Sequence, residues 1–216
     1  GISLKIAKRA MASIQGDINF NDIVDVINYY MSEFWVNLCT GDWDALKRYD
    51  ESIVNEAINK GVSWQSIANY LTALSFVEKE RGNFLVAQKM IEKFFDIGEQ
   101  YKNDQSKQLG YSHRLQFLIK IRRIHEAQLT AVKLMHFSKK KGFKFYLCWY
   151  YSFMAYIQIL QNDFDKAEKF LIYAEENLSE KERVPLLLSQ FLLSRFIFSL
   201  LKFEESIKNG DLTEIR

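Results

Sequence analysis

The stretch Phe84-Leu85-Val86-Ala87 decides the fold, because its pattern returns twice at a spacing of 40 residues. The second copy begins at Ile124 and the third at Phe164, and each has an alanine three positions later. Apolar residues further along stay in register: Ile91, Ala131 and Leu171, then Phe94, Leu134 and Ala174. A fixed period between about 20 and 50 residues is typical of stacked repeat proteins. Such repeats mostly present binding surfaces, so the pattern favours binding over catalysis.

The composition predicts helices rather than strands. One proline and nine glycines among 216 residues leave long segments without breakers, and 48% of the residues are hydrophobic. We expect an all-α fold, a right-handed superhelix (α-solenoid) in which each unit has a helix A, a short turn and a helix B. The chain is expected to form one repeat domain, 1–216, with units at 21–60, 64–101, 107–141, 145–178 and 184–216.

The turns set the helix boundaries. The expected helices are 2–13, 21–40, 43–59, 64–81, 84–101, 107–122, 125–141, 145–160, 164–177 and one that starts at Pro185. Gly41, Gly82, Asn162 and Gly210 suit the left-handed conformation that ends many helices. The turn Arg122-Arg123 has no such residue and is the exception.

These turns resemble those of tetratricopeptide repeats. Gly82-Asn83-Phe84-Leu85-Val86-Ala87 and Asn162-Asp163-Phe164-Asp165-Lys166-Ala167 look like the G-D-[YF]-x-x-A hallmark of that family, and Gly41-Asp42 and Gly210-Asp211 echo it. The resemblance covers roughly residues 20–216 and implies helical hairpins that bind proteins or peptides. Two features depart from the family: the unit is longer than the usual 34 residues, and the closing proline is missing. In this respect the chain resembles the helical sensor regions of bacterial signalling and transcription regulators.

Basic residues are concentrated in one part of the chain. Residues 106–144 contain ten Lys or Arg and a single acid, Glu126, a net charge of +9 against +2 for the whole chain. This segment is a candidate docking site for an acidic protein segment, a phosphate-bearing ligand or nucleic acid. The alternative is a solvated face whose cations meet acids of adjacent units. The candidate partner-binding residues here are Arg114, Lys120, Arg122 and Arg123.

The expected helix 145–160 is aromatic around much of its circumference. Packing on both sides explains this density, but some rings could instead line the surface formed by the A helices and hold a peptide. We therefore add Tyr150 and Tyr151 to the candidate residues.

Residues 186–203 are apolar on almost every face. Polar residues such as Ser189 and Arg195 argue against an isolated membrane span. We expect a following repeat, or a second copy of the chain in a homodimer, to cover this helix. The final residues from Gly210 read like the start of another repeat, so we expect the sequence to be a piece of a longer protein.

No motif of an enzyme occurs in the sequence. It contains no glycine-rich phosphate loop, G-x-S-x-G elbow or H-E-x-x-H pair, and its three histidines are spaced too widely for a metal site. We expect no enzyme, no cofactor and no metal. Two cysteines and no secretory signal favour a cytoplasmic protein without membrane contact.

The expected function is binding of a protein or peptide. The chain would be the regulatory or scaffolding part of a larger signalling or transcription-control protein. Two alternatives stay open: a peptide or small-molecule sensor coupled to an effector, and a nucleic-acid-binding repeat that uses residues 106–144.

Overall fold

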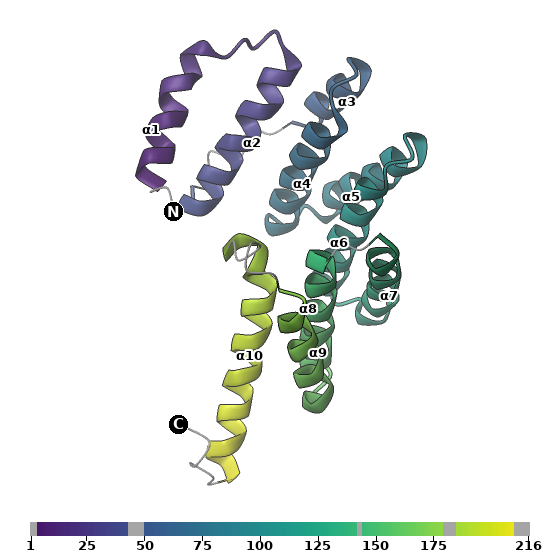
Figure 1. Cartoon of the computed structure of the whole chain (residues 1–216). Coiled ribbons are helices and arrows are strands. Elements are labelled where there is room, and N and C mark those ends of the chain that lie inside the picture. Colours follow the sequence, from purple (N-terminus) through teal and green to yellow (C-terminus); the bar gives the residue numbers. More distant parts are fainter. Residues whose placement is uncertain (1–3, 43–49, 142–143, 179–184, 210–216) are drawn as a thin grey trace. The chain divides into compact units, whose positions relative to one another are not determined.

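The computed structural model describes residues 4–42, 50–141, 144–178 and 185–209, and each regular element in these ranges is helical (Figure 1). In chain order the elements are α1 (Leu4–Ile14), the 3-10 helix η1 (Gln15–Asp17), α2 (Ile23–Thr40), α3 (Glu51–Asn59), α4 (Trp64–Glu80), α5 (Phe84–Gln100), α6 (Asp104–Lys120), α7 (Ile124–Lys141), α8 (Lys144–Leu160), α9 (Phe164–Glu176) and α10 (Pro185–Asn209). The expected all-α class is confirmed for this part of the chain.

The chain divides into two compact units, Gly1–His113 and Arg114–Arg216, whose boundary falls inside α6. In the first unit α2 packs against α1, α3 and α4, and α4 packs against α5. In the second unit α8 contacts α7, α9 and α10, and α10 also contacts α9. Helix α8 is therefore the centre of the second unit.

The 40-residue spacing holds through three pairs of helices. Helices α4, α6 and α8 begin at 64, 104 and 144 and end at 80, 120 and 160, while α5, α7 and α9 begin at 84, 124 and 164. Ala87, Ala127 and Ala167 are all 0% exposed. A methyl group at this position lets each second helix lie close to its neighbours, and the helix boundaries keep the 40-residue spacing seen in the sequence.

Within the described residues, a left-handed residue ends the helix at six turns. These residues are Gly41, Gly61, Gly82, Lys102, Arg122 and Asn162, with φ between 51° and 78°. At each turn the next residue donates its backbone N–H to the carbonyl five residues earlier, at 2.9 to 3.0 Å. This is the bond of the Schellman motif, which satisfies a carbonyl at the helix end. The expected caps at Gly41, Gly82 and Asn162 are confirmed, and Gly210 lies outside the described residues.

Arg122 adopts this conformation although it is not a glycine or asparagine, with φ of 62°. Lys102 does the same, with φ of 51°. Both turns close the same hydrogen bonds as the glycine turns. The turn Arg122-Arg123 is therefore not an exception in structure.

Some boundaries differ from the sequence prediction. Helix α6 begins at Asp104 rather than at Lys107, because the Asn103 side chain accepts a hydrogen bond from the backbone N–H of Ser106 at 2.9 Å and caps the helix. Helix α10 continues to Asn209, six residues beyond the apolar segment. The expected helix 43–59 appears as α3, which Asp50 caps by accepting from the Ser52 N–H at 2.9 Å, and 43–49 lies outside the described residues.

Candidate functional site

The basic residues of the predicted docking site are exposed. Arg114 and Lys120 lie on the part of α6 that belongs to the second unit, and Arg122 and Arg123 lie in the turn to α7. Arg123 pairs with Glu126 within the first turn of α7, with Nη2 2.5 Å from Oε2. This pair neutralises the one acid of the segment, and Lys107 at the start of the segment pairs with Glu99 of α5 at 2.9 Å.

Of the two tyrosines predicted to bind a partner, one lies in the interior. Tyr150 is only 5% exposed, and burial raises the pKa of its hydroxyl. A side chain so covered is not available to a partner, so Tyr150 is withdrawn from the candidate surface. Tyr151 is partly exposed, but its ring stacks on Phe170 of α9, with centroids 6.3 Å apart, and contacts Tyr173 at 5.4 Å. Packing on both sides of α8 therefore explains most of its aromatic density.

Helix α10 has an apolar face that its own unit does not cover. The side chains that make up this outer face are between 44% and 66% exposed: Leu192, Leu193, Phe196, Leu200, Phe203 and Ile207. Exposed leucines occur singly on most proteins, but six large apolar side chains along one helix form a continuous patch. Patches of this kind are typical of interaction sites.

The opposite face of α10 is fixed to the rest of the second unit. Phe191 and Phe198 are buried, and Ser194 Oγ donates to the backbone carbonyl of Ser152 in α8 at 3.0 Å. Phe198 stands 200° around the helix from both Phe196 and Leu200, since each residue advances about 100°. The packed face thus holds α10 in place while the outer face points away from α8.

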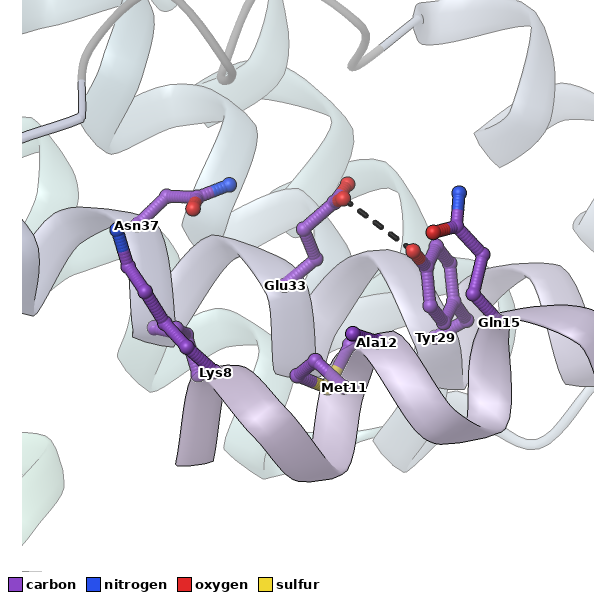
Figure 2. Close-up of a pocket in the computed structure, with 8 residues that line it drawn as sticks. Lys8, Met11, Ala12, Gln15, Tyr29, Glu33 and Asn37 are labelled. Carbon is purple, nitrogen blue, oxygen red and sulfur yellow. Dashed lines mark hydrogen bonds between the residues drawn. The ribbon is translucent and has the colours of Figure 1, made fainter. Parts of the chain in front are cut away.

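A pocket of about 210 Å³ lies between α1 and α2. Lys8 and Met11 of α1, Gln15 of η1, and Tyr29, Glu33 and Asn37 of α2 line it (Figure 2). Glu33 and Asn37 are each 8% exposed, and the Tyr29 hydroxyl donates to Glu33 Oε1 at 3.4 Å. Figure 2 shows the ammonium of Lys8 beside Asn37 on one side and the Glu33 carboxylate in the middle. The pocket therefore offers a cation and an anion within one small space.

A second polar cluster lies in the interior of the first unit. Lys79 Nζ is 3.2 Å from His113 Nδ1, and Ser75 Oγ is 2.9 Å from the same nitrogen. The Phe94 ring stacks on the imidazole with centroids 5.3 Å apart. Burial, and next the charge of Lys79, hold the pKa of His113 well below its usual value. An ammonium only donates, so Nδ1 accepts and the ring proton resides on Nε2.

The other repeats do not have this polar cluster at the corresponding sequence positions. The positions 40 and 80 residues after Lys79 are Ile119 and Ile159, both buried. The positions 40 residues before and after His113 are Ala73 and Phe153. The repeat architecture therefore accepts apolar side chains at these positions. Ser75, Lys79 and His113 are each at most 2% exposed, so no substrate reaches them and we assign them no catalytic role.

Two features are absent from the described ranges. Among them, no three His, Cys, Asp or Glu side chains gather as metal ligands would. No helix within them combines the length and the apolar character needed to cross a bilayer.

Comparison with known proteins adds no identity. No protein-family model matches the chain, and no curated protein matches its sequence. The candidate site therefore depends on the geometry alone.

The sequence reasoning missed part of this site. The outer face of α10 was hidden because residues 186–203 are apolar all round, and only the contacts of α10 separate the packed side from the free one. The spacing of Leu193, Phe196, Leu200 and Phe203 was a readable signal, since steps of three and four residues follow one helix face. For the Lys79–His113 cluster, comparison of residues 40 positions apart would have shown the change from apolar to polar.

Proposed function

We propose that this chain is a protein-binding helical-repeat module, and that the outer face of α10 is its main contact. The observation that carries the proposal is the row of exposed apolar side chains on a helix whose other face is packed. Water-exposed apolar area of this extent favours association, because burying it releases about 25 cal/mol per Å². The exposed Arg114, Lys120, Arg122 and Arg123 would add charge selectivity for an acidic partner segment.

The finer architecture belongs to the same proposal. The repeat register and the resemblance to tetratricopeptide repeats support a right-handed superhelix of stacked helical hairpins. The longer unit supports a regulatory or scaffolding part of a larger cytoplasmic signalling or transcription-control protein.

Site-specific photo-crosslinking tests the proposal. A benzophenone amino acid replaces Phe196, which is 66% exposed, and the chain is irradiated in a lysate of the cells that make it. The matched control carries the same group at Leu85, which is 80% exposed on α5. We expect a discrete protein adduct from position 196 and none from position 85. Absence of an adduct at 196, or equal labelling at both positions, would contradict the proposal.

The pocket between α1 and α2 favours a second candidate function, small-molecule sensing. Its Lys8 ammonium and Glu33 carboxylate suit the two opposite charges of a small zwitterion such as an amino acid. Calorimetric titration of the chain with the common amino acids tests this function. A Glu33→Gln variant should lose any binding seen, whereas heat signals that are equal in both proteins would exclude the pocket as the site.

A further inference from the structure

We propose that the partner of the outer face of α10 is the same face of a second copy of this chain, and that the two helices pair antiparallel. This inference rests on the proposed function and names its partner.

The exposed side chains follow a heptad pattern. Leu193, Phe196, Leu200, Phe203 and Ile207 are separated by steps of three, four, three and four residues. This repeat keeps one stripe of a helix facing a partner helix over its whole length and is the pattern of paired helices. The stripe is about 21 Å long, since 14 residues rise 1.5 Å each.

The stripe carries no charge along most of its length. The two cations within it in sequence, Arg195 and Lys202, turn toward α9, where Arg195 pairs with Glu175 at 2.9 Å and Lys202 with Glu168 at 3.2 Å. The apolar side chains of this face offer no charge to pair with an acidic or a basic partner. The exposed acids Glu204 and Glu205 lie near the C-terminal end of the stripe, so a second copy in the antiparallel direction keeps the two acidic ends apart.

The area suits a dimer. Six large side chains that are about half exposed contribute roughly 100 Å² each, or about 600 Å² per copy. Two copies would bury about 1,200 Å², which reaches the lower end of stable specific interfaces. A two-fold axis uses one patch twice, so a single self-complementary face is sufficient.

The order of side chains decides the direction. Aliphatic residues occupy one set of heptad positions (Leu193, Leu200 and Ile207), and phenylalanines occupy the other (Phe196 and Phe203). In a parallel pair each position faces its own copy, so phenylalanine would meet phenylalanine. In an antiparallel pair the two sets face each other, and each phenylalanine packs against an aliphatic side chain. A large phenylalanine side chain packed against a smaller aliphatic one fills the interface more evenly than two phenylalanines would.

Sedimentation velocity of the purified chain between about 1 and 100 μM tests the pairing, a range in which a micromolar dimer dissociates. We expect dimer at the upper end. Phe196→Glu should weaken the dimer at least about 100-fold, because it would bury a carboxylate in an apolar face. The matched control Leu85→Glu places the same charge on an exposed leucine of α5 and should leave the dimer unchanged. Circular dichroism establishes that both variants keep their helices.

Spin labels test the direction. Lys208→Cys is labelled in a background with Cys39→Ala and Cys148→Ala, and the distance between the two labels is measured. Antiparallel helices place them about 20 to 30 Å apart, and parallel helices about 10 Å apart. The short distance would overturn the antiparallel arrangement.

The outcomes separate the two proposals. A chain that stays monomeric throughout the range, yet forms a crosslink from position 196 to a different protein, overturns the homodimer and keeps the proposed function. A dimer that Phe196→Glu leaves intact overturns the assignment to α10. A monomer with no crosslink from position 196 overturns both.

Discussion

Replacing Lys79 by isoleucine should stabilise the protein. Lys79 is 2% exposed, and its ammonium contacts His113 Nδ1 at 3.2 Å and lies 5.9 Å from the centre of the Phe76 ring. At the corresponding positions of the next two 40-residue repeats the chain has Ile119 and Ile159, both buried. The substitution therefore installs the side chain that this architecture already packs.

The magnitude follows from opposing contributions. Removing an ammonium from water costs several kcal/mol even after relaxation. The hydrogen bond to His113 returns about 2 kcal/mol, and the cation–π contact with Phe76 about 1 kcal/mol. In the variant, His113 Nδ1 still has Ser75 Oγ at 2.9 Å, so the imidazole keeps a partner. We expect a net stabilisation of about 1 to 2 kcal/mol.

Thermal and urea unfolding followed by circular dichroism measure this change. A gain of about 1 kcal/mol should raise the melting temperature by about 2 to 4 °C in a chain of this size. The exposed Lys89→Ile controls for effects on the unfolded chain and should change stability by less than about 0.5 kcal/mol. The reciprocal Ile159→Lys places an ammonium where the repeat has no histidine and should destabilise by about 3 kcal/mol or more. A loss above about 1 kcal/mol in Lys79→Ile would refute the reasoning, because the ammonium would then be a net stabilising group.

Three further predictions follow from single residues. His113→Phe should remove a pH dependence of the unfolding free energy. In the unchanged protein the pKa of His113 is held low in the folded state, so its contribution to stability is complete above pH 6.5. Below that pH the unfolding free energy falls by up to about 1.4 kcal/mol per pH unit. Urea titrations between pH 5 and 7.5 measure this slope. Lys102→Gly should raise the unfolding free energy by about 1 kcal/mol, because φ of 51° strains any side chain with a Cβ. Gly98→Ala should lower it by about 1 to 3 kcal/mol, since the new methyl group would stand 3.1 Å from the backbone nitrogen of Lys107 and 3.2 Å from the carbonyl oxygen of Asn103.

Each of these has its own check. An unchanged slope below pH 6.5 in His113→Phe would mean that another group is responsible for it. Gly82→Ala is the reverse of Lys102→Gly and should destabilise, because φ there is 78°. Gly16→Ala, which adds a methyl group to open space, should change stability little, and a loss equal to that of Gly98→Ala would contradict the close approach of α5 and α6.

The register of the three clear units could be predicted because small and apolar residues recur at positions that must fit the same gap. Ala87, Ala127 and Ala167 show this, since any larger side chain would separate two helices. The left-handed conformation of Lys102 and Arg122 could not be predicted, because neither residue type prefers it. There the hydrogen bonds that close two neighbouring helix ends outweigh the local strain.

The candidate site was predicted less completely. Exposure of Arg114 and Lys120 could be expected from their charge, but the burial of Tyr150 could not, because a helix that is aromatic all round does not reveal which rings face inward. The two sides of α10 posed the same difficulty. Only tertiary contacts such as the Ser194–Ser152 hydrogen bond distinguish a packed side from a free one.

The Schellman motif at Gly82, Arg122 and Asn162 makes the chain extensible. Since each of these turns stops a helix by the same backbone geometry, a duplicate of residues 83–122 inserted after Arg122 would create a junction equivalent to one that already exists. The added pair of helices would need no helix cap that the chain does not already contain. In the proposed superhelix, growth or shortening by whole forty-residue blocks is thus a change that the backbone can accept at one point.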